Sequence, residues 1–374
     1  MISISLRPFL THARTAAEIL AASASYWEDL GTAATQIPNV RELHGSKILV
    51  TGATGMICSA VVDVLLYLNR EFDAGILVYV AGRSEKQAAQ RFGSFSTADG
   101  LNYVPYDAAG RELVSVDTTL DYIIHGASNA NPALYAERPV ETMLANILGL
   151  STMFDLARAR EARRLLYISS SEVYGQKDGS QPYGEEDYGY LDILNERASY
   201  PSSKRAGESL CVEYGMEYNV DSVIVRPGHI YGPSIRDSDN RASAEFTRLA
   251  ARGSNVILRS KGRQLRSYCH SLDCASAILS VLLKGTHANA YNISNPNSIC
   301  TMSDIAEAIA TAGGVELKYD VPTSVASTTH NLMENSSLAS RKLEALGWSP
   351  AFDLEHGVER MMTALKAQSG AFSL

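Results

Sequence analysis

The sequence lacks the apolar run of about 18 residues that a membrane-spanning helix needs. Near the N-terminus, Arg14 and Glu18 interrupt the apolar stretch that a targeting peptide requires, so we expect a helical extension there. Lysine and arginine form no basic block, and the net charge is −8. We therefore expect a soluble cytoplasmic protein that inserts into no membrane and has no nucleic-acid partner. Any phosphate-bearing ligand would be held by local arginines and helix N-termini.

Cysteine is scarce, and its pattern indicates neither a disulfide framework nor a zinc site. Of the five cysteines, only Cys269 and Cys274 lie close together, and no second pair completes a site. The eight histidines show no i, i+4 spacing, so we expect no metal. The odd number of cysteines indicates reduced thiols in the cytoplasm. These are either small buried side chains or include a single nucleophile.

What is present is an ordinary globular composition, with 374 residues, 45% hydrophobic and 20% charged. Strand and helix patterns alternate from Lys47 onward. Expected strands are Ile48–Val50, Ile76–Ala81, Asn102–Pro105, Asp121–His125, Leu165–Ser169 and Asp221–Arg226. The alternation predicts an α/β fold, a Rossmann-type doubly wound parallel sheet. Such sheets bind ligands beyond the carboxyl ends of their strands.

Three regions are expected along the chain. Residues 1–44 form a helical N-terminal extension, and residues 45–227 form the Rossmann domain. Within the latter, helices are expected from the first turn through Leu68 and over Glu85–Arg91, Asn146–Ala159 and Ser202–Tyr214. Residues 228–374 are expected to form mainly a smaller α+β lid that binds substrate and can return strands to the first domain. Its expected helices are Ala242–Ala251, Asp273–Leu283, Ser303–Ala312 and Leu338–Leu346.

A glycine turn lies between the first strand and its helix, in Val50-Thr51-Gly52-Ala53-Thr54-Gly55-Met56-Ile57-Cys58. Glycines at Gly52 and Gly55 let the backbone turn tightly, so that a pyrophosphate can approach the N–H groups of the helix N-terminus. The usual third glycine is replaced by Cys58, which predicts a slightly larger separation of helix and strand. The turn indicates a dinucleotide site.

The second strand ends in Val80-Ala81-Gly82-Arg83-Ser84, without the carboxylate that usually grips the adenosine ribose. Arg83 either faces a 2′-phosphate or is a solvated residue at the start of a helix. NADP is therefore an alternative to NAD as the cofactor. Asp107, after the third strand, either accepts from the adenine amino group or caps a turn.

Tyr200-Pro201-Ser202-Ser203-Lys204 is the central catalytic motif. Residues four apart share a helix face, so the ammonium of Lys204 is expected beside the ring of Tyr200 and is expected to lower its pKa. That would make Tyr200 a general base for an alcohol proton. Upstream, Ser169-Ser170-Ser171-Glu172 ends a strand, where a hydroxyl can bond the same substrate oxygen.

These segments together resemble the extended short-chain dehydrogenases, which are sugar-nucleotide epimerases, dehydratases and decarboxylases. The resemblance covers residues 45–350, in VTGATGMI, HGASNANP, Asn146-x-x-Gly149, SSSEVYG, YPSSK and RPGHIYGP. It implies that Ser170, Tyr200 and Lys204 are the catalytic trio, with Glu172 beside them. It implies a sugar-nucleotide substrate, NAD as cofactor and a homodimer formed through paired helices. The cofactor residues that it implies are Gly52, Thr54, Gly55, Met56, Ile57, Arg83, Asp107, His125, Ala127, Asn146, Tyr200 and Lys204.

Finer features resemble the uronic-acid decarboxylases. Ser171 stands where the 4,6-dehydratases carry an aspartate, and Ser171-Glu172 and Arg197 fit the decarboxylases. In Gly262–Tyr268, Arg266 matches the lid arginine that reaches the sugar diphosphate or the active site, and Arg241 is a second candidate, unless either is a solvated surface charge. Ser128 and His229 complete the expected substrate residues. His229 replaces the usual asparagine, which leaves an altered substrate open.

The expected reaction is oxidation of a sugar hydroxyl at C4 to a transient ketone, followed by loss of carbon dioxide from a C6 carboxylate. A 4-epimerase needs the same trio and remains an alternative. Arg83 would favour another, an NADPH-dependent keto-sugar reductase. The alternative that is not an enzyme is a non-catalytic NAD(P)-sensing regulator. The intact trio of Ser170, Tyr200 and Lys204 argues against it.

Overall fold

The computed structural model describes residue 20 and residues 23–370, except 94, 111–113, 178, 180, 237–238 and 322–333. Part of the expected N-terminal extension, residues 1–19 and 21–22, therefore lies outside the described residues. In the part that is described, the extension contains helix α2 (Ala24–Thr35) and the short turn η1 (Val40–Leu43).

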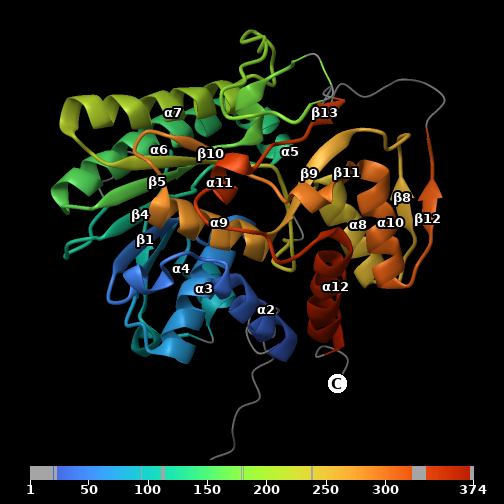
Figure 1. Ribbon diagram of the computed structural model, residues 1–374, viewed down its shortest axis with the longest axis horizontal. Helices are drawn as coiled ribbons and strands as arrows, with labels where there is room; N and C mark the ends of the chain where they lie inside the picture. Colours follow the sequence, from blue (N-terminus) through green and yellow to red (C-terminus); the bar gives the residue numbers. More distant parts are fainter. Residues whose placement is uncertain are drawn as a thin grey trace, which may run out of the picture.

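A seven-stranded sheet forms the centre of the molecule (Figure 1), and every neighbouring pair in it is parallel. The expected doubly wound parallel sheet is confirmed. The strand order reverses between β1 and β4, because the chain crosses to the opposite edge after the third strand. In spatial order the strands are β10 (Ala290–Ile293), β6 (Ser222–Pro227), β5 (Arg164–Ile168), β4 (Tyr122–His125), β1 (Lys47–Thr51), β2 (Leu77–Gly82) and β3 (Leu101–Pro105).

Helices cover both faces of this sheet (Figure 1). On one face α6 (Pro139–Ala159) packs against α7 (Ser199–Tyr218), with the short α5 (Pro132–Glu137) beside α6. On the other face lie α3 (Met56–Phe72), α4 (Glu85–Phe92) and α9 (Ser271–Lys284). Their buried aliphatic side chains form two separate apolar cores, one on each side of the sheet. The sheet and its two helical layers thus hold the strand ends in fixed positions.

A second, smaller group of elements follows β6 in the chain. Strand β9 pairs with three short strands, and β8 pairs with β12, while α8, α10 and α12 enclose a third apolar core. Strand β10 and helix α9, although later in sequence, belong to the large sheet and its helical layer. The elements are β7 (His229–Tyr231), α8 (Ala242–Ala251), β8 (Val256–Leu258), β9 (Leu265–His270), β11 (Ile299–Thr301), α10 (Met302–Gly313), β12 (Leu317–Tyr319), β13 (Asn335–Ser336) and α12 (Leu354–Gly370).

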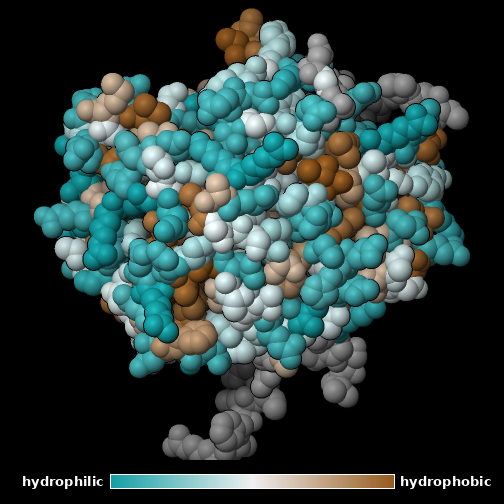
Figure 2. Space-filling view, in the orientation of Figure 1, coloured by the Kyte–Doolittle hydropathy of each residue, from teal (hydrophilic) through white to brown (hydrophobic). Residues whose placement is uncertain are grey.

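One expected helix of this region is wrong in length. The structure replaces Leu338–Leu346 with the single turn α11 (Arg341–Glu344), because residues 335–336 extend as β13 beside β9. The remaining short turns are η2 (Thr97–Asp99), η3 (Ser171–Tyr174) and η4 (Pro296–Ser298). The face drawn in Figure 2 is mostly hydrophilic, with apolar residues in small separate groups.

Helix α2 connects the two parts of the molecule, because it packs on α3, α9 and α12. The hydroxyl of Tyr26 donates to Asp63 on α3 at 2.7 Å. From α12, Arg360 donates to Asp29 through Nε at 2.6 Å. The N-terminal helix is therefore part of the packed structure.

Candidate active site

A cavity of about 1110 Å³ opens where the carboxyl ends of the parallel strands face the smaller group of elements. Because β1 and β4 flank the point where the strand order reverses, this is the crevice in which doubly wound sheets bind ligands. Most residues predicted for the site line it: Gly52, Thr54, Gly55, Met56, Ile57, Arg83, Asp107, Ala127, Ser128, Ser170, Ser171, Glu172, Arg197, Tyr200, Lys204, His229, Arg241 and Arg266.

Two predicted cofactor residues, His125 and Asn146, are not among the cavity-lining residues and lie buried. His125 forms a 2.9 Å hydrogen bond with the hydroxyl of Thr51, and burial lowers its pKa to about 3. Asn146 donates to Ser203 at 2.9 Å and so ties α6 to α7. Both residues support the wall of the cavity, because tertiary packing turns their side chains into the core.

The turn after β1 brings backbone close to the cavity. Gly52 has a φ of +64°, and a Cβ there would lie 2.8 Å from the carbonyl carbon of Gly126, so only glycine fits. Gly55 precedes α3 with no side-chain cap, which leaves N–H groups of the helix free to bind an anion. The turn therefore fits a pyrophosphate.

Cys58 fills the position of the missing third glycine. A Cβ on Gly126 would lie only 2.3 Å from the Cys58 sulfur, so the absence of a side chain at Gly126 makes room for the thiol. The cysteine is thereby accommodated at the strand junction, and burial raises its pKa to about 12. A protonated, buried thiol of this kind is inert.

The end of β2 carries more positive charge than the sequence pattern indicated. Arg83 lies 3.4 Å from Glu141, and its side chain is 62% exposed. Opposite it, Arg236 donates to the hydroxyl of Thr54 at 2.7 Å. Asp107 accepts from the N–H of Ala109 at 3.1 Å and also lines the cavity, so it caps a turn at the cavity wall.

Ser170, Tyr200 and Lys204 meet at one wall of the cavity. The Ser170 hydroxyl lies close enough to the Tyr200 phenol to favour its ionised form. The ammonium of Lys204 lies 5.7 Å from the centre of the Tyr200 ring and donates to the carbonyl of Ile168 at 2.7 Å. The strand end thus presents a hydroxyl, and the helix presents a phenol and an ammonium, to the same space.

The prediction that the pKa of Tyr200 is lowered is wrong for the protein without bound ligand. Burial and the nearby Glu172 carboxyl raise the pKa of Tyr200, and the nearby Ser170 hydroxyl opposes them only in part. Burial also lowers the pKa of Lys204 to about 7, so the charge that was expected to acidify the phenol is itself weakened. Burial, which helix spacing does not reveal, is the stronger effect.

Glu172 and Arg197 are joined by a residue that sequence reasoning missed. Tyr135, on α5, accepts a hydrogen bond from Arg197 at 3.3 Å, and its hydroxyl lies beside the Glu172 carboxyl. Burial raises the pKa of Glu172, and Arg197 opposes that shift. The carboxyl is therefore suited to hold a proton.

Three predicted substrate residues come from the smaller group of elements. Arg266 is 2% exposed and donates to the carbonyl of Leu265 at 2.8 Å, and burial lowers its pKa. Burial lowers the pKa of His229 to about 3, helped by Arg266 and Arg241, so its ring is neutral. Of these groups, Arg266 is therefore the main source of positive charge at the cavity, because the His229 ring is neutral.

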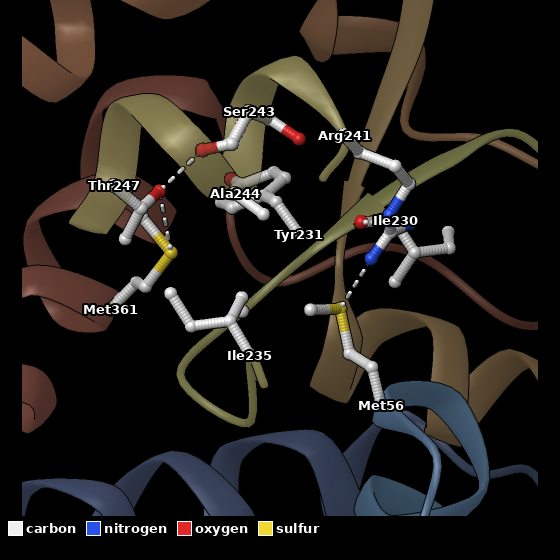
Figure 3. Close-up of a pocket in the computed structure, with 10 residues that line it drawn as sticks. Met56, Ile230, Tyr231, Ile235, Arg241, Ser243, Ala244, Thr247 and Met361 are labelled. Carbon is white, nitrogen blue, oxygen red and sulfur yellow. Dashed lines mark hydrogen bonds between the residues drawn. The ribbon is translucent and has the colours of Figure 1, made fainter. Parts of the chain in front are cut away.

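Arg241 is already paired. Its guanidinium binds Asp239 through Nε at 3.0 Å and through Nη2 at 2.6 Å. Figure 3 shows the same side chain reaching toward Met56 on α3, with Nη2 at 3.6 Å from the sulfur. Arg241 thus joins the segment before α8 to the first turn of α3, and its charge is largely neutralised by Asp239.

A buried ion pair supports the catalytic wall from behind. Arg226, on β6, donates to Glu208 through Nη2 at 2.6 Å and through Nε at 2.9 Å. Ser169 donates to the same carboxylate at 2.6 Å. Because Glu208 lies one turn after Lys204 on α7, these bonds fix that helix against β6 and against the end of β5.

Comparison with known proteins assigns the chain to a family. The model of the NAD-dependent epimerase/dehydratase family matches residues 48–294, which is more than half of the chain. The chain belongs to this family. Among curated proteins, it is 29% identical to UDP-glucuronic acid decarboxylase 6 of Arabidopsis thaliana over 87% of this chain and 90% of the relative.

Solved structures that align along most of their own length share the fold. A dTDP-glucose 4,6-dehydratase from Streptomyces venezuelae, solved with NAD, aligns with a TM-score of 0.72 and 22% identity over 87% of this chain and 98% of that one. A UDP-glucose 4-epimerase from Thermotoga maritima, solved with UDP-glucose, aligns with a TM-score of 0.71 and 21% identity over 85% and 98%.

Membership of this NAD-dependent family confirms NAD as the expected cofactor. The residues present fit it, because the cradle at Gly52 and the uncapped start of α3 receive a pyrophosphate. Within the described ranges, no group of three metal-ligating side chains occurs. Among the same residues, no helix is long and apolar enough to span a bilayer.

Tyr135 and Arg236 are among the cavity-lining residues that the sequence did not reveal. Tyr135 follows the HGASNANP segment on a short helix of its own, and Arg236 lies in the loop after β7. No spacing relates either of them to the glycine turn or to the tyrosine–lysine pair. Both reach the cavity only through the packing of distant segments.

Proposed function

We propose that this chain decarboxylates a UDP-hexuronate by transient oxidation of the sugar at C4. The observation that carries the proposal is the meeting of Tyr200, Ser170 and Glu172 at a cavity that the buried Arg266 of β9 also lines. The 29% identity to a UDP-glucuronic acid decarboxylase supports the same reaction. An arginine is suited to a carboxylate or diphosphate through two parallel hydrogen bonds.

Tyr200 takes the proton of the C4 hydroxyl, and Ser170 holds the oxygen while it becomes a ketone. NAD, held at the glycine turn, would supply the acceptor for the C4 hydride, and its positive charge would favour the phenolate of Tyr200. The C4 ketone is β to the C6 carboxylate, so carbon dioxide leaves as the electron pair of its bond moves into an enolate. Glu172, whose pKa is raised, donates the proton that restores C5.

The test is incubation of the purified protein with NAD and UDP-glucuronate, followed by mass spectrometry. We expect a product lighter by one carbon dioxide and no lasting accumulation of NADH. UDP-glucose is the matched control, because it lacks the carboxylate and its mass should not fall. Unchanged UDP-glucuronate overturns the decarboxylase proposal.

The same experiment separates the alternatives. A product of equal mass and inverted configuration at C4 would select a 4-epimerase. Stoichiometric oxidation of NADPH with a 4-keto sugar would select a reductase. Binding of NAD without any turnover of sugar nucleotides would select the non-catalytic sensor.

We also propose a homodimer formed through α6 and α7. Apolar side chains are exposed along these two adjacent helices, namely Val140, Met143, Leu144, Leu148, Val212 and Met216. A second copy would bury them, because exposed apolar groups of this kind mark interaction sites. Light scattering should give twice the chain mass, and Met216→Lys, at a position 78% exposed, should shift the protein toward the monomer.

A cytoplasmic location is part of the proposal. All five cysteines are unpaired thiols, and four of them are buried. Thiols persist in a reducing compartment, where nucleotide cofactors are also available. Fractionation of cells that express the protein should therefore recover it with the cytosol.

A further inference from the structure

A chain of polar contacts runs from the N-terminal helix α2 to the loop that follows β7. At its start, the Tyr26 hydroxyl donates to Oδ2 of Asp63 on α3 at 2.7 Å. Arg91, on α4, donates to the same carboxylate through both terminal nitrogens, with Nη1 at 3.1 Å from Oδ1. Its Nη2 also donates to the Ser234 hydroxyl in the loop at 3.2 Å. These four side chains form the Tyr26 network, which joins α2, α3, α4 and the loop.

The loop end of the Tyr26 network lies at the cavity. Ser234 lines the cavity, and so does Arg236, two residues later. Nη2 of Arg236 donates to the carbonyl and to the hydroxyl of Thr54, with the hydroxyl at 2.7 Å. Thr54 belongs to the glycine turn that fits the pyrophosphate. Contacts that begin in the N-terminal extension therefore end at the dinucleotide turn.

Arg236 is held at this turn against the repulsion of like charges. Partial burial lowers the pKa of Arg236, and the charges of Arg83 and Arg91 lower it further. The buried Asp63 carboxylate offsets the charge of Arg91. Because a buried acceptor is costly to leave unsatisfied, the bond from Tyr26 favours the orientation in which both oxygens of Asp63 face Arg91. That orientation in turn fixes the guanidinium that binds the loop.

We propose that the Tyr26 network holds Arg236 at the glycine turn, so that NAD affinity depends on a helix that precedes the family match. Tyr26 does not line the cavity, so it is a positioning residue that acts through the loop after β7. An arginine already fixed beside the turn favours pyrophosphate binding, because less side-chain entropy is lost when the ligand binds. This role needs only bound NAD and is independent of the reaction at the sugar.

A double-mutant cycle on NAD⁺ affinity, measured by isothermal titration calorimetry on the full chain, tests the proposal. We expect Ser234→Ala to weaken NAD⁺ by about fivefold and Tyr26→Phe by about threefold, because each variant loses one hydrogen bond of the network. The double variant should also be weakened by about fivefold, because both changes break the same connection. Independent effects would multiply to about fifteenfold, and that result would overturn the proposal.

Trp27→Phe is the matched control, because Trp27 joins the same two helices without reaching the loop. Its Nε1 donates to Glu71 on α3 at 2.8 Å. Tyr26→Phe and Trp27→Phe thus each remove one hydrogen bond between α2 and α3, and thermal unfolding measures the stability that each variant loses. Only Tyr26→Phe should weaken NAD⁺. Equal weakening by the two variants, or by neither, would leave Tyr26 with a purely structural role and overturn the proposal.

Hydrogen–deuterium exchange of the protein without NAD reports on the loop itself. The amide groups of residues 232–236 should exchange faster in Tyr26→Phe and in Ser234→Ala than in Trp27→Phe. Exchange in Tyr26→Phe equal to that of the unmodified protein would contradict the proposal, because the network would then not hold the loop. Neither measurement uses a sugar nucleotide, so a failure to decarboxylate UDP-glucuronate leaves both results intact.

Discussion

The ring of Tyr135 lies parallel to the ring of Tyr200, with centroids 5.2 Å apart and planes inclined by 11°. The hydroxyl of Tyr135 accepts a hydrogen bond from Arg197 and lies beside the Glu172 carboxyl. One side chain from α5 therefore touches both the proposed base and the proposed acid. It is a positioning residue for each of them.

Tyr135→Phe separates the two roles of this residue, because it keeps the stacked ring and removes the hydroxyl. We expect kcat to fall by about tenfold, since Glu172 and Arg197 each lose a partner. The affinity for the dinucleotide should stay the same. Steady-state kinetics and calorimetry provide the measurement, and a kcat equal to that of the unmodified protein would show that the hydroxyl has no role.

Tyr200→Phe should lower turnover by roughly a thousandfold, as expected when a general base is removed. Dinucleotide binding should persist, because the glycine turn is untouched. Tyr188→Phe is a suitable control, as Tyr188 is 70% exposed. Comparable activity of Tyr200→Phe and the control would disprove the role of the phenol.

The phenol of Tyr200 should remain protonated well into the alkaline range in protein freed of nucleotide. Burial raises its pKa, and a phenol with a raised pKa becomes phenolate only above its ordinary value of about 10. The absorbance difference between the unmodified protein and Tyr200→Phe, followed during an alkaline titration, measures this. A phenolate signal near neutral pH would contradict it.

Asp273 should make the free energy of unfolding depend on pH. Burial raises its pKa to about 7, from about 3.9 in an unfolded chain. The folded state therefore holds this proton more tightly than the unfolded chain does. The stabilisation that results is complete below about pH 4 and is lost as the pH rises to about 7. The free energy of unfolding then falls by at most about 1.4 kcal/mol per pH unit.

Urea unfolding at several pH values measures this dependence. Asp273→Asn should flatten it and cost some stability at low pH, because one of the bonds accepted from Ala351 and Phe352 is weakened. Asp117→Asn, at an exposed position, is the control and should leave the slope unchanged. An unaltered slope in Asp273→Asn would assign the dependence to another group.

The large sheet could be predicted because its strands are buried on both faces and appear as short apolar runs between turns. Asp121–His125 differs from β4 by one residue at its start, and Leu165–Ser169 differs from β5 by one residue at both ends. Strands β7, β8 and β11 are only three residues long, too short to show an alternating pattern. They are strands because of what they pair with, and sequence does not show a pairing partner.

The residues on the strand-end turns were predicted to lie at the site, and they line the cavity. His125 and Asn146 fall behind the wall, because their motifs locate a segment but not the direction of a side chain. The pKa of Tyr200 was predicted in the wrong direction, because spacing reveals a neighbouring charge but not its burial. Tyr135 and Arg236 depend on long-range packing and could not be found from the sequence.

The docking of α2 bears on how the chain can be shortened in the laboratory. The family match begins only at residue 48, which invites removal of everything before the first strand. Such a truncation would remove the ion-pair partner of Arg360, which is Asp29. It would also expose the apolar surfaces of α3, α9 and α12 on which α2 packs. An expressed fragment should therefore begin no later than residue 23, because loss of α2 would expose apolar surfaces through which the protein could aggregate.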